Sequence, residues 1–332
     1  MTTALVGDIG GTHVRLGLAR LEGGRVRLQA TSVVRGREQP DLATPVRAFL
    51  QAQGARPTVA CLGIAGTIEH VDGDARVSGV NLPWSVEVRA LERACQLERV
   101  VLINDFHAAA RGVEQLGPED WSALNPGEPV ADAPVAILGA GTGLGQAFLV
   151  GPPGRRAVLP TEGGHRDFAP RDPLQDRLLA FLRARHEGRV STERVLSGPG
   201  MIAIYDFLRS EGHPADPEVQ AVWGTIACGK TLSARAAGGH HPTSVAALAV
   251  FVDVYGAEAG NLVLTLLARG GVWVAGGIAP QVLQNPTQAQ AFRRAYLDKG
   301  RFASLLESVP VRLVTHRDLG LLGAGGEALA RT

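Results

Sequence analysis

The chain begins with short apolar segments separated by glycine-bearing turns. Residues 4–9 form an apolar run that a single aspartate interrupts, and apolar side chains alternate with arginine or small residues along residues 14–19. This alternation is typical of a half-buried strand, and two glycines between the segments permit a tight turn. A second glycine turn at residues 22–24 leads into another strand at residues 25–28. The pattern therefore predicts three successive antiparallel strands.

The following segments alternate between helix and strand. Thr44 followed by Pro45 is a typical helix start, and an apolar strand is expected at residues 58–64. Ser85 is expected to cap a second helix, which leads to another apolar strand at residues 99–103. The predicted order for this part of the chain is βββαβαβ.

The opening pattern returns in the second part of the chain. Residues 117–134 are rich in Pro, Gly, Asp and Glu and lack periodicity, so we expect a domain junction there. Residues 135–150, VAILGAGTGLGQAFLV, again read as strand, glycine turn and strand. Residues 244–267 have apolar positions at steps of three and four, which predicts a core-facing helix, and residues 272–278 form a strand with another glycine turn. A glycine-turned hairpin thus opens each half.

Composition is that of a globular protein with about two domains. The 332 residues, 45% of them hydrophobic, are sufficient for a large core. The 33 basic and 32 acidic residues nearly cancel, so no charge pattern favours nucleic acid or an anionic membrane. Asp253, Glu258 and Asn261 interrupt the longest apolar stretch and disfavour a membrane span. The three cysteines are scattered singly and no signal-peptide pattern precedes the first strand, so we expect a cytoplasmic protein that acts on small molecules.

Residues 224–231, GTIACGKT, match the phosphate-binding pattern G-x-x-x-x-G-K-[S/T]. Such a loop must leave a buried strand and enter a helix, because the strand aims the backbone amides at the phosphate. Asp216, Pro217 and Glu218 instead form a helix-start signal, and that helix is expected to continue into Gly224. The context favours a surface junction between helices. The segment GAGTGLG is likewise followed by a strand, which argues against a dinucleotide-binding fingerprint.

Residues 7–13, GDIGGTH, have the composition of a phosphate site. A glycine turn between antiparallel strands exposes consecutive N–H groups, and Thr12 adds a hydroxyl donor. Asp8 beside such a site requires a cation, for which we expect Mg²⁺ carried by ATP and bound directly or through water. GAGTGLG and AGGI supply two further glycine turns. The residues expected to bind the nucleotide are Gly7, Asp8, Gly10, Gly11, Thr12, Gly141, Thr142, Gly143, Gly276 and Gly277.

Six segments together resemble the bacterial ATP-dependent glucokinases, a non-ROK branch of the actin, hexokinase and Hsp70-type ATPase superfamily. They are LVGDIGGTHVRLGLA, INDF, GAGTGLG, EGGHRDFAP, ERVLSGPG and GGVWVAGGIAP, and they occur in order along nearly the whole chain. The cysteine-rich zinc motif of the ROK kinases is absent. The resemblance implies a two-lobed α/β fold, actin-like and ribonuclease H-like, with an active-site cleft between the lobes. Residues 1–115 and 316–332 would form the smaller lobe, and residues 116–315 the larger one.

The resemblance also implies an activity: a homodimeric enzyme of glycolysis that transfers the γ-phosphoryl group of ATP to the 6-hydroxyl of glucose. Asp105, which follows the strand at residues 99–103, would be the general base that takes the hydroxyl proton. A helix N-cap is the structural alternative for Asp105, and both roles are compatible. The residues implied to bind sugar hydroxyls are Asn104, Glu162, His165, Glu193 and, with a plain turn as the alternative, Asn81.

Two features depart from the family pattern. His13 stands where the family usually has asparagine, and the polar loop at residues 64–79 is longer and lacks a proline after Gly66. Three alternatives stay open: a kinase for another hexose or amino sugar, phosphoryl transfer from ADP or polyphosphate, and a sugar-sensing repressor. The repressor would need a helix-turn-helix, for which we expect no room before the strand at residue 4.

Overall fold

The computed structural model describes residues 2–77 and 83–330, and the chain divides into two compact units. Unit 1 consists of residues 1–119 and 316–332, and unit 2 consists of residues 120–315. Each unit has its own mixed β-sheet, five-stranded in unit 1 and six-stranded in unit 2. The C-terminal segment therefore returns to the unit that the N-terminal segment begins.

The sheet of unit 1 has the strand order β3-β2-β1-β4-β8. Its strands are β1 (Thr3–Ile9), β2 (His13–Glu22), β3 (Arg25–Arg35), β4 (Val59–Ile64) and β8 (Arg99–Asn104). β1, β2 and β3 are antiparallel neighbours, which confirms the predicted hairpins, whereas β4 and β8 run parallel to β1. Alternate residues of β1 face opposite sides: Leu5 and Ile9 join one apolar cluster, and Ala4 and Val6 join another.

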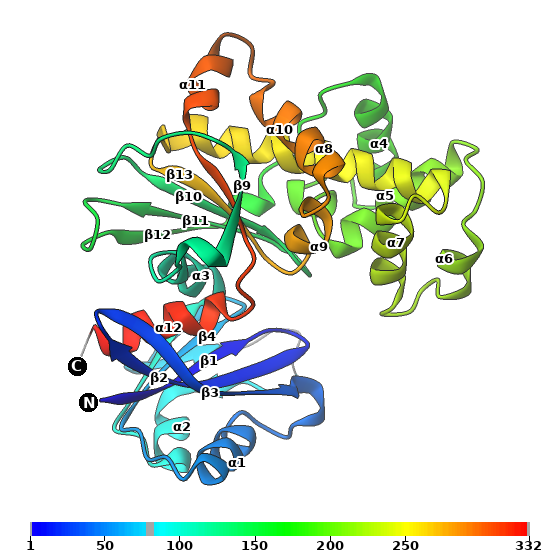
Figure 1. Cartoon of the computed structure of the whole chain (residues 1–332). Helices are drawn as coiled ribbons and strands as arrows, with labels where there is room; N and C mark the ends of the chain where they lie inside the picture. Colours follow the sequence, from blue (N-terminus) through cyan, green and yellow to red (C-terminus); the bar gives the residue numbers. More distant parts are fainter. Residues whose placement is uncertain (1, 78–82, 331–332) are drawn as a thin grey trace. The chain divides into compact units, whose positions relative to one another are not determined.

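Helices cover both faces of this sheet (Figure 1). The helices are α1 (Ala43–Gln53), α2 (Val88–Cys95), α3 (Asp105–Val113) and α12 (Leu319–Leu329), with a 3₁₀ turn at Gly36–Glu38. Phe49 of α1 and Leu91 of α2 pack in the cluster of Leu5. Ala108 of α3 and Leu321 of α12 pack in the cluster of Val6. The face towards α3 and α12 is the one that Asp8 shares with Val6, because the two residues lie two positions apart on β1.

Most of the described part of the loop expected at residues 64–79 forms strands instead, and residues 78 and 79 lie outside the described residues. β5 (Ile68–Val71) and β6 (Asp74–Val77) make a hairpin, and β7 (Val86–Glu87) completes a three-stranded sheet. Asp72 and Gly73 both have positive φ at the turn, and Asp-Gly is a strong signal for a two-residue hairpin. The signal was therefore present in the sequence, although the polar composition hid it.

The expected cap of α2 is also wrong. Ser85 precedes β7, and the residue before the helix is Glu87, which makes no side-chain cap bond. Asp74 of β6 instead accepts a hydrogen bond from the backbone N–H of Arg89 at 3.2 Å. An acceptor from another strand thus satisfies one of the open N–H groups of the helix start.

The sheet of unit 2 has the order β12-β11-β10-β13-β14-β9. Its strands are β9 (Trp121–Asn125), β10 (Val135–Ala140), β11 (Leu144–Val150), β12 (Ala157–Thr161), β13 (Gly271–Ala275) and β14 (Val311–Val314). β10 pairs antiparallel with β11 and parallel with β13, as β1 does with β2 and β4 in unit 1. The first five strands in this order therefore repeat the arrangement of unit 1. β9 lies within the segment whose lack of periodicity suggested only a junction.

The helices of unit 2 centre on α8 (Pro242–Leu266). The others are α4 (Pro173–Arg183), α5 (Gly198–Ser210), α6 (Pro217–Ala221), α7 (Cys228–Ala237), α9 (Ala279–Leu283), α10 (Pro286–Leu297) and α11 (Ala303–Ser308), with 3₁₀ turns at Gly163–His165, Thr192–Arg194 and Gly300–Phe302. A further 3₁₀ turn, Pro118–Asp120, spans the boundary between the two units. α8 is long and apolar enough to cross a membrane, but 78% of its most apolar window is buried inside the protein. This confirms the predicted core helix; of its large hydrophobic side chains only that of Leu266, at its end, is substantially exposed.

Candidate functional site

The first glycine turn connects β1 and β2 in unit 1. The N–H of Gly10 donates to the carbonyl of His13 at 3.0 Å and closes the turn. The N–H groups of Gly11 and Thr12 form no hydrogen bond within the described part of the chain. Two backbone donors and an exposed threonine therefore lie at one turn, as a phosphate site requires. Gly7 lies earlier, inside β1, where a Cβ atom would approach Leu62 to 2.6 Å, so this glycine serves packing.

Asp8 lies on β1 beside Arg15 of β2 and near the start of α12. Its carboxylate is 4.0 Å from the Arg15 guanidinium, and a Cβ atom on Gly320 would lie 3.1 Å from its Cγ. The pKa of Asp8 is raised, chiefly by burial and also by the nearby Asp318, whereas Arg15 opposes this by lowering it. The surrounding protein thus leaves the charge only partly compensated, and a bound cation would complete the compensation. The described residues hold no cluster of three or more His, Cys, Asp or Glu side chains suited to a metal, so such a cation would also need oxygen ligands from a substrate.

Asn104 and Asp105 lie at the junction of β8 and α3. The N-cap is Asn104, whose Oδ1 accepts hydrogen bonds from the N–H groups of Phe106 at 2.9 Å and His107 at 3.3 Å. Asp105 is the first residue of α3, and its Oδ1 also accepts from the N–H of Phe106 at 2.9 Å. The capping role considered for Asp105 therefore belongs mainly to Asn104.

A buried acid joins α3 to α12. Glu327 of α12 has a side chain that is 7% exposed; its Oε1 accepts from Arg111 at 2.6 Å and lies 3.1 Å from Nε2 of His107. The hydrogen bond from His107, with those from Arg111, lowers the pKa of Glu327 to about 2 against the opposing effect of burial. Since α3 begins with Asp105, this cluster fixes the helix that carries the candidate base.

In unit 2 the two predicted glycine turns lie together. Gly141 bonds to Gly143 across the first turn at 2.8 Å, and the N–H of Ile278 donates to the carbonyl of Ala140 at 3.3 Å. Gly276 has φ +84°, and a Cβ atom there would lie 2.6 Å from the Ala140 oxygen, so the second turn requires glycine.

A third segment joins the two turns, the start of α5. The N–H of Gly198 donates to the Gly141 carbonyl at 2.8 Å, and Ser197 caps the helix by accepting from the N–H of Gly200 at 3.1 Å. Sequence reasoning gave α5 no role, although serine followed by proline two residues later is a helix-start signal.

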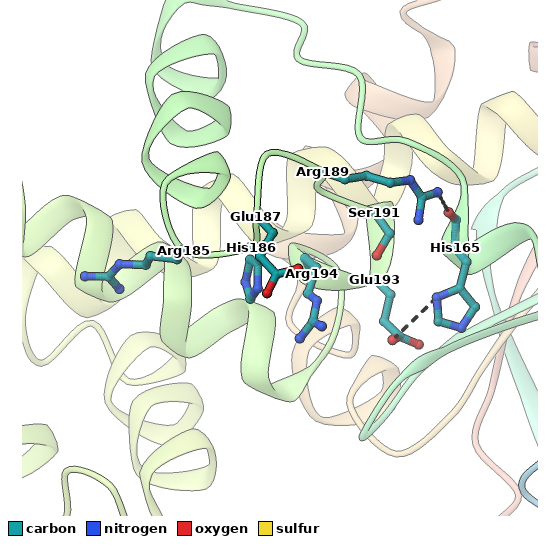
Figure 2. Close-up of a pocket in the computed structure, with 8 residues that line it drawn as sticks. All are labelled: His165, Arg185, His186, Glu187, Arg189, Ser191, Glu193 and Arg194. Atoms are coloured by element: carbon teal, nitrogen blue, oxygen red, sulfur yellow. Dashed lines mark hydrogen bonds and ion pairs between the residues drawn. The ribbon is translucent and has the colours of Figure 1, made fainter.

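Three of the implied sugar-binding residues come together in unit 2, and Figure 2 shows two of them, His165 and Glu193. Nδ1 of His165 lies 4.0 Å from Oε1 of Glu193, and its Nε2 lies 3.9 Å from Oε2 of Glu162. Glu193 is further fixed because its Oε2 accepts from the N–H of Leu144 at 2.9 Å, at the end of the first glycine turn. His165 and Glu193 border a cavity of about 380 Å³, and the other lining residues are Arg185, His186, Glu187, Arg189, Ser191 and Arg194. Asn81 lies outside the described residues.

A hydrogen-bond network around the buried acid Glu258 holds the loop that carries Glu162 and His165. Arg166 donates through Nε to the Gly163 carbonyl at 3.1 Å, and its guanidinium pairs with Glu258 of α8. Glu258 also accepts hydrogen bonds from Nε2 of Gln146 at 2.7 Å and from Nδ2 of Asn261 at 3.0 Å. From the sequence alone, Glu258 indicated only that the apolar stretch around it does not span a membrane. In the structure, Arg166 links it to the loop that carries Glu162 and His165.

The segment GTIACGKT has the surroundings that the sequence predicted. The helix that precedes it is α6, capped by Asp216, although it ends at Ala221 instead of continuing to Gly224. Gly224 lies in a turn with φ +75°, and α7 then begins at Cys228. Lys230 is therefore an exposed residue in the first turn of a helix. No strand leads into this segment, and the nucleotide-loop interpretation stays rejected.

Several known proteins are similar to this chain. A family model described as Glucokinase matches residues 5–331. The glucokinase of Psychromonas ingrahamii is 41% identical over 322 residues, covering 97% of this chain and 95% of that protein. The crystal structure of a glucokinase from an Antarctic psychrotroph has a TM-score of 0.82 and 29% identity over 99% of both chains. A ROK family glucokinase from Streptomyces griseus, in complex with glucose and AMPPNP, has a TM-score of 0.65 and 24% identity over 99% of both chains.

These neighbours confirm the predicted fold class, the two-lobed actin-like ATPase fold. The family match spans nearly the whole chain and includes all six segments on which the resemblance was based. The chain therefore belongs to the glucokinase family.

Proposed function

We propose that this protein is a glucokinase that transfers the γ-phosphoryl group of ATP to the 6-hydroxyl of D-glucose, giving glucose 6-phosphate and ADP. The observation that carries the proposal is the grouping of Glu162, His165 and Glu193 in a chain of the glucokinase family. The relative from Streptomyces griseus, bound to glucose and the ATP analogue AMPPNP, supports the choice of both substrates.

Asp105 is the proposed general base. Its carboxylate accepts the proton of the 6-hydroxyl while that oxygen forms a bond to the γ-phosphorus and the bond from phosphorus to the ADP oxygen breaks. General base catalysis of this kind contributes on the order of 10²–10⁴-fold in rate. The end of β8 and the first turn of α3 hold the group in place, so its orientation depends on backbone and not on a mobile loop.

The sugar is proposed to bind through Asn104, Glu162, His165 and Glu193. Carboxylates accept hydrogen bonds from hydroxyls, and the side chain of Asn104, whose Oδ1 caps α3, has Nδ2 left to donate. A sugar with an inverted or missing hydroxyl would leave one of these groups unpaired, which is the physical basis of selectivity. For Asn81 the same role stays a prediction.

The phosphates of ATP are proposed to bind at the glycine turns, with Thr12 and Thr142 as hydroxyl donors. Mg²⁺ bound to ATP would neutralise phosphate charge, and Asp8 is the residue proposed to hold it, directly or through water. One carboxylate with phosphate oxygens and waters is an ordinary ligand set for Mg²⁺. The partly compensated charge of Asp8 fits this role.

The proposal is tested by measuring ADP release by the purified protein with Mg²⁺ and ATP, with and without glucose. Mannose, fructose, galactose and N-acetylglucosamine serve as parallel substrates. In further reactions ADP or polyphosphate replaces ATP as donor, and the product followed is the sugar phosphate. Strong stimulation by glucose alone supports the proposal. Stimulation by another sugar keeps the mechanism and changes the substrate, whereas no stimulation by any sugar contradicts a sugar kinase.

We also propose a cytoplasmic location and a homodimer. Cys61, Cys95 and Cys228 are buried free thiols, which suits a reducing compartment. The homodimer rests on the family resemblance, and light scattering at several protein concentrations would test it.

A further inference from the structure

Two neighbouring residues of α8 contact both parts of the proposed site in unit 2. Tyr255 and Glu258 are three positions apart, so they share one face of the helix. The hydroxyl of Tyr255 accepts a hydrogen bond from the N–H of Ala140 at 3.0 Å and donates to the carbonyl of Ala275 at 3.3 Å. These two residues end β10 and β13, directly before the glycine turns at Gly141 and Gly276.

Glu258 performs the equivalent task for the sugar side. It binds Gln146 on β11 and Arg166, and Arg166 in turn binds the Gly163 carbonyl in the loop between Glu162 and His165. The side chain of Glu258 is 5% exposed, and that of Tyr255 is fully buried. Water therefore cannot easily replace either group as a partner.

We propose that Tyr255 and Glu258 are positioning residues, which set the two glycine turns and the sugar-binding loop from a single turn of α8. This inference rests on the proposed function, because it assigns the turns to nucleotide and the loop to sugar. Neither side chain touches a reacting atom in this proposal. Each acts through the backbone segments it holds.

The hydroxyl of Tyr255 suits this task because it accepts from one strand and donates to the next. A hydrogen atom must stay on the oxygen for the second bond, and burial raises the pKa of Tyr255, which keeps the group protonated. The ring packs against Phe251 and Phe292, with centroids 5.8 and 5.7 Å away. A phenylalanine at position 255 would keep these ring contacts and lose only the two hydrogen bonds.

The test compares Tyr255→Phe, Glu258→Gln and a control, Phe251→Leu, which alters the same core on α8 without removing a hydrogen-bonding group. We expect Tyr255→Phe to raise KM for ATP about tenfold and to leave KM for glucose unchanged, since a buried N–H loses its partner. Glu258→Gln should raise KM for glucose about tenfold and leave KM for ATP unchanged. Phe251→Leu should lower thermal stability without separating the two constants.

Hydrogen exchange supplies a readout that does not depend on activity. Tyr255→Phe should speed exchange at residues 141–143 and 276–278, and Glu258→Gln should speed it at residues 163–166, each relative to Phe251→Leu. If the wild-type protein shows no sugar-stimulated ADP release, the proposed function fails, and the exchange pattern alone decides whether these side chains position the segments. If all three variants change both constants and all segments alike, Tyr255 and Glu258 only stabilise the core and the proposal is overturned.

Discussion

Glu327 offers a quantitative test of how α12 supports the helix that begins with Asp105. The variant Glu327→Gln keeps the size of the side chain and removes its charge. The glutamine oxygen retains an acceptor for Arg111, but the pairing of charges with Arg111 is lost. We therefore expect the contact between α3 and α12 to weaken while both helices still form.

The magnitude follows from the shift in pKa. The pKa of Glu327 falls from 4.5 in the unfolded chain to about 2 in the folded protein. A difference of that size corresponds to about 3 kcal/mol of stability, because each pKa unit is worth about 1.4 kcal/mol. The folded pKa is depressed, so this stability is fully present above the unfolded value of 4.5 and is lost as pH falls towards 2. About half of it should remain at pH 3.

Hydrogen exchange of the amides in α3 and α12 is the suitable assay, because it reports the opening of these helices without requiring the whole chain to unfold in one step. Wild type and variant are compared at pH 7 and pH 3, with each rate divided by that of an unstructured peptide. We expect the free energy of opening to fall by about 2–3 kcal/mol at pH 7 and by about half as much at pH 3.

The control is Glu22→Gln, an exposed acid at the end of β2. It should change the opening of α3 and α12 by less than about 0.5 kcal/mol at either pH. Two results would refute the reasoning: a loss below about 0.5 kcal/mol at pH 7, or a loss that does not decrease between pH 7 and pH 3.

Three further predictions concern the proposed site. Asp105→Ala should lower kcat for phosphoryl transfer by at least about 10²-fold while glucose binding changes little, as judged by calorimetry; near-normal turnover would exclude it as the base. Lys230→Ala should alter neither turnover nor ATP affinity, because Lys230 is exposed on α7, and a lost affinity for ATP would restore the GTIACGKT segment as a nucleotide site. Gly276→Ala should lower the free energy of unfolding by about 1–3 kcal/mol and weaken ATP binding, because the φ of Gly276 is +84°. The control Gly277→Ala has open space around its Cβ position and should unfold like wild type. Equal losses of stability in the two variants would contradict the steric argument.

The parts of the fold that the sequence predicted well are those that short-range chemistry determines. The hairpins of β1–β2 and β10–β11 combine alternating apolar residues with a glycine turn, and both are correct. The helix start at Asp216 is correct for the same reason, since its cap bond reaches only to Glu218. Where one local signal opposed another, as in the polar hairpin around Asp72, the prediction was wrong.

The supports of the site could not be predicted in this way, because they join residues far apart in the chain. Glu327 meets His107 across 220 positions, and Tyr255 meets Ala140 across 115. Each of these residues looks ordinary in its own segment: an acid in a short helical tail and an aromatic residue in a core helix. The residues proposed to contact substrates lie in recognisable motifs, whereas the residues that hold these segments in place are brought together only by the completed fold.

The return of α12 to unit 1 has a consequence for how the protein is made. Ala4 and Val6 of β1 share a core cluster with Leu321 and Ala324 of α12. The ribosome therefore synthesises all of unit 2 before the last helix of unit 1 exists. Until α12 is made, α3 alone packs on that face of the N-terminal sheet, so apolar side chains that α12 later buries stay exposed while unit 2 is synthesised. Unit 2, whose residues are continuous in sequence, can complete its core first.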